Sequence, residues 1–219
     1  MKTKAAGKRR RKKVRFKKDG KYRARRTALA ILCLAVILGT MFGIVRGLPG
    51  GIVKHMGSTP VPDWVSVQLL SVDGHSRSGK TLKDVNDIVI HYVGNPGSTG
   101  QANRDYFASE KSNVSSHFVV GLEGEVIQCI PLDEYSAASN HRNGDTISIE
   151  VCHPDDSGRF NDATYQSLVQ LTGWLCREAR LSENHVIRHY DVTGKICPKY
   201  FVEHEDAWEQ FLADVKKEL

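Results

Sequence analysis

The sequence predicts an α/β domain with a mixed central β-sheet flanked by helices, preceded by an N-terminal transmembrane helix. Three observations lead to this fold class. Short apolar runs rich in β-branched residues alternate with segments of helical periodicity across residues 63–219. A glycine-containing stretch between two of these runs indicates one antiparallel hairpin. An uncharged stretch of 18 residues follows a strongly basic start, as expected for a membrane span.

The first 26 residues carry the positive charge of the chain. They hold 15 Lys and Arg against one acid, whereas 16 basic and 24 acidic residues follow from Thr27 onward. Such a basic tail would by itself suggest nucleic-acid binding. Because an apolar segment follows, we interpret residues 1–26 as a cytoplasmic tail that sets orientation and attracts anionic lipid head groups. We expect no nucleic-acid partner.

The apolar segment runs from Ala28 to Val45 and ends at Arg46. At about 1.5 Å per residue such a helix nearly crosses a hydrocarbon core about 30 Å thick. Residues 27–46 are therefore predicted to be a signal-anchor in the cell membrane, with the following domain outside the cell. A cleaved signal peptide is the alternative, although the basic block is long and no clear A-x-A site follows.

Residues 47–62 contain four glycines and three prolines and are predicted to be a linker. A flexible tether of this length spans roughly 20–25 Å, which would keep the outer domain near the membrane. The folded domain is predicted over residues 63–219. It is large enough to bury its own core.

The first half of this domain predicts an edge strand at 65–72 and a buried strand at 87–92 that ends beside His91. A short helix is expected over 101–108, with Ser98 or Thr99 near its start. Next come the two strands of the hairpin and a further apolar strand: 117–120, 125–130 and 146–152.

The second half predicts a helix over 162–180, with Asn161 available as its N-cap. Val186 and Ile187 form a brief strand. A final helix carries apolar residues along one side: Trp208, Phe211, Leu212 and Val215.

A candidate metal site is centred on the stretch from Arg188 to Pro198. His189 and Cys197 lie eight positions apart here, on a stretch whose Thr and Gly predict a tight loop. Nitrogen with sulfur is a donor set that zinc favours, and a catalytic zinc site has three protein ligands and an open position. His91 supplies the third, so His91, His189 and Cys197 are predicted to hold Zn²⁺.

Two charged residues are candidates for catalysis. Glu150 lies in an apolar strand, where a carboxylate costs free energy unless it has a partner or a task. Near the metal it would be the general base that accepts a proton from the attacking water. Lys195, two residues before Cys197, is expected to stabilise an oxyanion or bind a substrate carboxylate.

Five segments carry a family resemblance: IVIHYVGNPG, NRDYF, SSHFVVGLEGEVIQCIP, ISIEVC and RHYDVTGKICP. Together they resemble the zinc-dependent N-acetylmuramoyl-L-alanine amidases, the type-2 amidase superfamily that includes phage lysozyme-amidases and animal peptidoglycan recognition proteins. The resemblance implies a zinc-dependent peptidoglycan hydrolase with ligands His91, His189 and Cys197. It also implies hydrolysis of the amide bond between N-acetylmuramic acid and L-alanine. The bacterial and prophage endolysin branch further implies Glu150 as base, and its lysine matches Lys195.

One position departs from the superfamily pattern. The phage lysozyme and recognition-protein branch has an active-site tyrosine where this chain has Ser116. Two alternatives to the amidase reading stay open: a peptidoglycan-binding module without catalysis, and an amidase acting on another muropeptide amide. No obligate protein partner is expected.

If Cys197 binds metal, three cysteines remain outside the apolar segment, and an odd number cannot all pair within the chain. We interpret Cys129, Cys152 and Cys176 as buried free thiols, with a Cys129–Cys152 bridge as the alternative.

Overall fold

The computed structural model describes residues 50–72 and 74–219. The predicted cytoplasmic tail 1–26 and signal-anchor 27–46 lie outside these residues. Within the described part of the chain, none of the helices combines the length and the apolar composition needed to cross a bilayer.

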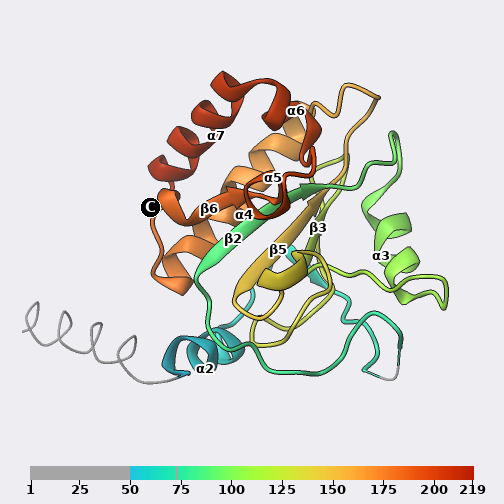
Figure 1. Ribbon diagram of the computed structural model, residues 1–219, viewed down its shortest axis with the longest axis vertical. Helices are drawn as coiled ribbons and strands as arrows, with labels where there is room; N and C mark the ends of the chain where they lie inside the picture. The colour runs from blue at the N-terminus through green and yellow to red at the C-terminus, as the bar shows by residue number, and fades with distance from the viewer. Residues whose placement is uncertain (1–49, 73) are drawn as a thin grey trace, which may run out of the picture. The chain divides into compact units, whose positions relative to one another are not determined.

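Six strands form one mixed sheet in the order β1-β4-β3-β5-β2-β6 (Figure 1). The β3–β4 pair is the antiparallel hairpin that the sequence predicts, and the other neighbours run parallel. This confirms the predicted mixed sheet. The strands are β1 (Val65–Val67), β2 (Asp87–Tyr92), β3 (Phe118–Val120), β4 (Val126–Gln128), β5 (Thr146–Val151) and β6 (Val186–Arg188).

Helices cover both faces of the sheet. The described helices are α2 (Gly51–Ser58), α3 (Gly100–Ala108), α4 (Asp162–Ala179), α5 (His189–Thr193), α6 (Lys199–Glu203) and α7 (Glu205–Lys217), with 3-10 turns η1 (Asn140–Arg142) and η2 (Glu183–His185). Two of the predicted helices have the expected caps: Asn161 accepts a hydrogen bond from Thr164 N at the start of α4, and Thr99 accepts one from Ala102 N at the start of α3.

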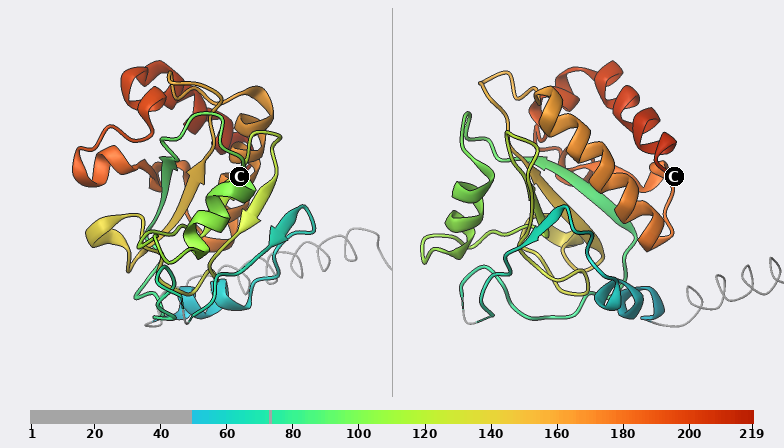
Figure 2. Two further views of the ribbon diagram at one scale, coloured as in Figure 1. Left: turned by 90° about the vertical axis from the view of Figure 1, so that its right-hand side faces the viewer. Right: turned by 180° about the vertical axis from the view of Figure 1, so that it is seen from behind.

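The larger core lies between the sheet and α4 with α7, which pack together over one face, as the view from behind shows (Figure 2). Ile147, Ile149 and Val151 of β5 point into it, as strand alternation predicts. The final helix buries Trp208 and Phe211 against the same core.

The opposite face carries a smaller core beside α3. It is built from Leu70, Phe107, Val119, Ile127, Cys129, Ile130 and Cys152. The residues of β2 and β5 that alternate away from the larger core include His91 and Glu150, which are register partners in adjacent parallel strands. The sheet therefore places these two polar residues side by side on the α3 face.

The predicted linker is wrong over residues 51–58. These residues form helix α2, which buries Ile52, Val53 and Met56 in the larger core. The three apolar side chains lie on one face of the helix at i, i+1 and i+4, a helical pattern that the glycine and proline count obscured. The folded body therefore begins before the predicted boundary at residue 63.

A core substitution tests this assignment of α2. Met56 is 1% exposed, so Met56→Ala is expected to lower the free energy of unfolding by about 2–5 kcal/mol, the usual cost of removing a large buried side chain. Chemical unfolding of the full-length chain, followed by tryptophan fluorescence, measures it. Lys54→Ala on the exposed side of the same helix is the control. If Met56→Ala and Lys54→Ala were equally stable, residues 51–58 would not pack in the core and the linker interpretation would stand.

Two further differences concern irregular segments. The stretch 188–198, predicted as a tight loop, begins with the short helix α5 and turns at Gly194, whose φ of 77° favours glycine. The edge strand β1 is shorter than the predicted 65–72.

The interpretation of Cys129, Cys152 and Cys176 as buried free thiols is confirmed.

Candidate metal centre

Neighbouring strands deliver the two histidines to one place. His91 is the fifth residue of β2, and β6 pairs with β2 so that Ile90 lies opposite Arg188. His189 follows Arg188 directly and begins α5. Parallel pairing therefore carries the next residue of each strand, His91 and His189, to the same end of the sheet.

Cys197 returns to this point through the turn after α5. The backbone N–H of Tyr190 donates to the carbonyl of Cys197 at 2.9 Å, which closes the segment on itself. Cys197 is 1% exposed. A loop of this size lets a sulfur ligand approach the two imidazoles without a third strand.

The three donor atoms converge. The Nδ1 atoms of His91 and His189 are 3.1 Å apart, and the Cys197 Sγ lies 3.9 Å from His91 Nδ1. One ligand atom from each residue falls within 4.8 Å of the others, and all three residues are buried. Two imidazole nitrogens and one sulfur facing a common point fit a zinc ion in both chemistry and spacing.

The protonation states of the two histidines suit metal binding. Burial lowers the pKa of His91 well below its ordinary value, and the nearby His189 and Lys195 lower it further. Burial and Lys195 also lower the pKa of His189. Neutral imidazoles are the form that binds metal. Burial, with Glu150 next, raises the pKa of Cys197 to about 12, so metal binding must release its proton.

Glu150 lies against the cluster. Its Oε1 is 4.0 Å from His91 Nδ1, and its side chain is 19% exposed. Its Oε2 is buried and has no hydrogen-bond partner among the described residues. Burial raises the pKa of Glu150 to about 8, although the positive charge of Lys195 opposes the shift. An unpartnered carboxylate oxygen beside a ligand cluster is available to take a proton.

Lys195 lies on the exposed loop between α5 and Cys197. It lines a cavity of about 580 Å³ together with the three candidate ligands and Glu150. The structure thus brings all five predicted site residues to one cavity. The cavity extends toward α3, where Asn103 and Tyr106 line it.

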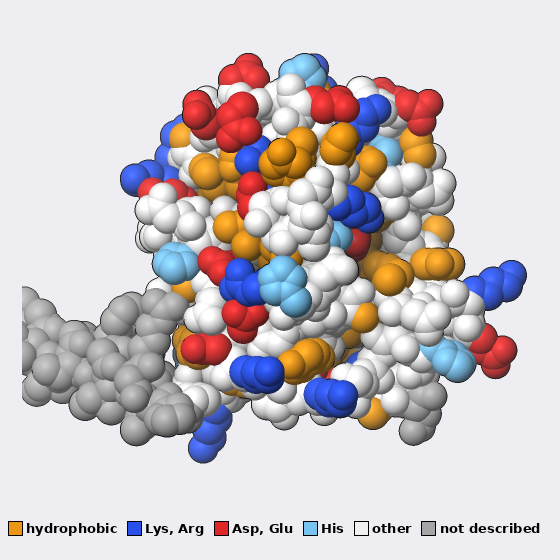
Figure 3. Space-filling view, viewed as in Figure 1, with side chains coloured by type: hydrophobic (Ala, Val, Ile, Leu, Met, Phe, Trp, Pro, Cys, Tyr) orange, Lys and Arg blue, Asp and Glu red, His pale blue; other side chains and the backbone are white. Residues whose placement is uncertain are grey.

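The face that presents α5 in Figure 1 is mixed in character. Lys and Arg side chains are interspersed there with Asp, Glu and hydrophobic side chains (Figure 3).

Other polar residues near the motif do not join the cluster. His117 is buried in a separate network, with its Nδ1 3.1 Å from Ser148 Oγ and its Nε2 2.9 Å from the Glu134 carbonyl. Asp191 pairs with Arg188, and the ring of His153 lies tilted against that of Tyr92, with the centroids 5.0 Å apart.

Ser116, which stands where the phage lysozyme and recognition-protein branch has a tyrosine, is buried, and its hydroxyl donates to the Phe118 carbonyl. It therefore does not replace a tyrosine in the cavity. Ser139 and Asn140 contact the two histidines. In the sequence Asn140 was only one of several polar residues that could line the cleft, and spacing alone did not single it out.

Comparison with known proteins places these observations in a family. The family model described as N-acetylmuramoyl-L-alanine amidase matches residues 81–200. The chain is 35% identical over 150 residues to the amidase CwlL of Bacillus licheniformis, covering 61% of this chain and 41% of CwlL. It is 28% identical over 171 residues to the amidase BlyA of Bacillus subtilis (strain 168), covering 68% of this chain and 46% of BlyA. The chain thus spans less than half of these relatives.

Solved structures share the fold. The catalytic domain of XlyA superposes with a TM-score of 0.60 at 24% identity, covering 69% of this chain and 98% of that domain. PlyL superposes with a TM-score of 0.62 at 23% identity, covering 69% and 96%. The family model covers the strands and loops that carry all five site residues, and the chain belongs to the N-acetylmuramoyl-L-alanine amidase family.

Proposed function

We propose that the chain is a zinc-dependent peptidoglycan hydrolase that cleaves the amide bond between N-acetylmuramic acid and the L-alanine of the stem peptide. The observation that carries the proposal is the convergence of His91, His189 and Cys197 within 4.8 Å beside the unpartnered carboxylate oxygen of Glu150. Membership of the amidase family supports the choice of bond.

His91, His189 and Cys197 would hold the zinc ion. When bound, zinc polarises a carbonyl oxygen and lowers the pKa of water at its open position. The cavity beside these residues is also lined by Asn103 and Tyr106 of α3.

Glu150 carries the proton transfer in this proposal. Its carboxylate accepts a proton as water attacks the amide carbon, and the protonated carboxyl then donates it to the departing L-alanine nitrogen. The C–O bond forms, the C–N bond breaks, and Glu150 returns to its starting state. A single residue serves as base and then as acid because burial holds its pKa above that of an ordinary glutamate.

Lys195 would stabilise the negative oxygen that forms on the carbonyl. Lys195→Met is expected to lower kcat by no more than about 100-fold with little change in KM, since an exposed ammonium contributes less than the ~10²–10³-fold of a buried oxyanion donor. Steady-state kinetics on a defined muropeptide measures both constants, with exposed Lys83→Met as the control. A raised KM at unchanged kcat would assign Lys195 to a substrate carboxylate instead.

Product analysis tests the reaction. The full-length chain incubated with purified cell walls should release new amino termini without new reducing sugar ends. Reducing ends would mark a glycosidase and end the proposal. A chelator arm addresses the binding-module alternative, because a pure binder keeps its wall affinity and shows no metal-dependent cleavage. Mass spectrometry of defined muropeptide products separates the muramyl amide from other amides.

The location of the protein is a separate proposal. The basic residues 1–26 and the apolar run 28–45 within the predicted signal-anchor 27–46 support a single-pass anchor in the cell membrane, with the amidase domain on the cell-wall side. Protease added to intact spheroplasts should then degrade the domain, and the chain should sediment with membranes. Recovery of a protected chain in the soluble fraction would contradict this placement.

A further inference from the structure

Two consecutive residues, Ser139 and Asn140, contact the two candidate histidine ligands on the side away from the cluster. The Nδ1 atom of each imidazole faces the cluster, so the Nε2 atoms point the other way. His189 Nε2 lies 2.8 Å from Asn140 Oδ1, and His91 Nε2 lies 3.3 Å from Ser139 Oγ. One short segment therefore contacts both rings on the side opposite the proposed ion.

This arrangement selects a tautomer. A neutral imidazole has one N–H and one lone pair. An amide oxygen can only accept, so the Asn140 contact requires His189 to carry its hydrogen on Nε2, leaving the lone pair on Nδ1. The Ser139 hydroxyl can accept from His91 in the same sense. The two Nδ1 lone pairs then face each other at 3.1 Å, an arrangement that a cation between them stabilises.

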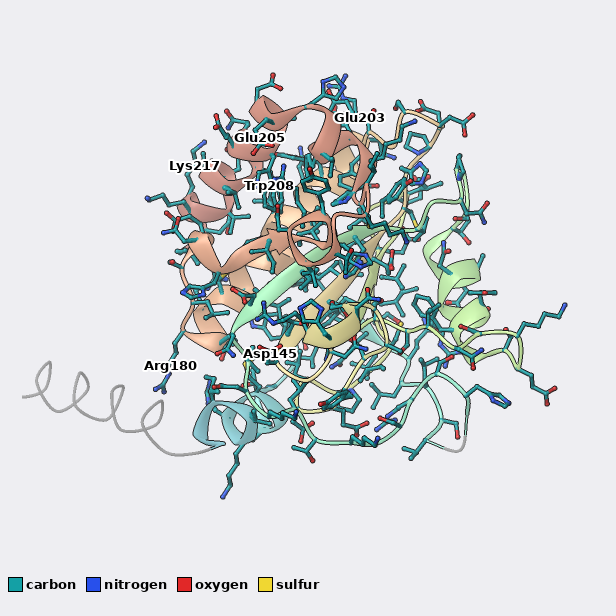
Figure 4. All side chains as sticks on the ribbon, in the orientation of Figure 1. Asp145, Arg180, Glu203, Glu205, Trp208 and Lys217 are labelled. Carbon is teal, nitrogen blue, oxygen red and sulfur yellow. The ribbon has the colours of Figure 1, made fainter. Side chains whose placement is uncertain are left out.

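The segment is itself fixed. Ser139 N–H donates to Asn143 Oδ1 at 2.6 Å. Arg142 pairs with Asp87 at the start of β2 and with Asp145, labelled in Figure 4, just before β5. The segment 139–143 is thus tied to the beginnings of the same two strands that carry His91 and Glu150 further along.

The backbone at Asn140 is specialised as well. Its φ is 54°, in the left-handed region. Asn and Asp reach this region more readily than other residues with a Cβ. Asn140 therefore combines two features at one position: a backbone conformation that few residue types adopt easily, and a side chain that contacts His189.

We propose that Asn140, supported by Ser139, is a positioning residue that holds His189 in the Nε2-protonated tautomer and so orients its Nδ1 lone pair toward the proposed zinc ion. The inference rests on the proposed zinc centre for its purpose and on the 2.8 Å contact for its geometry. Partners of this kind typically contribute 10–100-fold to metal affinity.

The test uses three variants of the full-length chain. Asn140→Gly removes the acceptor and keeps the left-handed backbone accessible, so it isolates the side chain. Asn140→Asp retains an oxygen acceptor and the backbone preference. His141→Ala, at the exposed neighbouring position, is the control. Zinc affinity is measured by competition with a chromophoric chelator, and the tautomer of His189 by ¹⁵N NMR of the metal-free chain at about pH 8, above the ordinary histidine pKa.

We expect about 10–100-fold weaker zinc binding for Asn140→Gly, affinity at least equal to wild type for Asn140→Asp, and unchanged affinity for His141→Ala. In the metal-free chain, His189 should be Nε2-protonated in the wild type and a tautomer mixture in Asn140→Gly. Unchanged zinc affinity and unchanged tautomer in Asn140→Gly would overturn the inference while leaving the zinc centre intact. If the wild type bound no zinc, the proposed function would fail, and the tautomer comparison would still decide the role of Asn140.

Discussion

Cys197→Ser is expected to remove the bound metal and with it the amidase activity. A serine hydroxyl stays protonated where a metal-bound thiol ionises, so the substitution removes both the sulfur donor and its negative charge. Loss of an outer partner of a metal ligand already costs about 10–100-fold in affinity or activity. The loss of a ligand should therefore exceed ~100-fold in both.

Metal content and turnover are measured on the same preparations. Metal analysis of the purified full-length chain should give about one zinc per wild-type molecule and far less in Cys197→Ser. Stripping the wild type with a chelator should abolish turnover, and added zinc should restore it. The control is Cys176→Ala, which removes a buried thiol from α4 and leaves the three candidate ligands in place. Full turnover in metal-stripped wild type would refute the metal site.

Glu150→Gln is expected to keep zinc and lower kcat by at least ~100-fold, within the 10²–10⁴-fold range of general acid–base catalysis. Glutamine has nearly the same size, so the cavity and the ligand cluster keep their shape, but the amide cannot accept a proton from water. Metal analysis together with kinetics on a defined muropeptide separates this result from ligand loss. Near-normal turnover would remove Glu150 from the mechanism.

The pH profile gives an independent test of the same residue. Burial raises the pKa of Glu150 to about 8 in the metal-free chain, and Lys195 lowers it. A bound dication acts in the same direction as Lys195 because it favours the carboxylate. The acidic limb of kcat/KM should therefore have its midpoint below 8, with activity rising as Glu150 ionises. That limb should disappear in Glu150→Gln.

Stability separates a catalytic defect from a folding defect. A carboxyl whose pKa is raised in the folded state favours folding while it is protonated. Its contribution is lost as pH rises from the unfolded value of 4.5 through the folded value of about 8. The metal-free Glu150→Gln chain should therefore be at least as stable as the metal-free wild type near pH 8. If Glu150→Gln were less stable than the wild type at this pH, its loss of turnover would be explained by unfolding and not by the missing base.

Local sequence patterns were sufficient for most of the regular elements. The apolar strand expected over 146–152 is β5, and its Ile147, Ile149 and Val151 lie in the larger core. Capping side chains gave the starts of α3 and α4. The sequence patterns did not predict α2. Its glycines and the neighbouring prolines suggested a linker, and this short helix depends on packing its three apolar residues in the core.

The sequence by itself determined which donor atoms the protein has to offer: two imidazoles, one thiol and a carboxylate in an apolar strand. These choices are chemical and can be read from residue type and context. It also determined the family, through segments that carry those same residues.

Only the tertiary structure decided how those atoms meet. The parallel pairing of β2 with β5 and β6 places His91 beside Glu150 and His189, although His189 lies 98 positions along the chain from His91. The contacts of Ser139 and Asn140 with the far sides of both rings were likewise invisible in the sequence. The physical reason is that hydrogen bonds between distant segments depend on which strands become neighbours and on the backbone conformation of the loops, and the residue types of a single segment do not specify either.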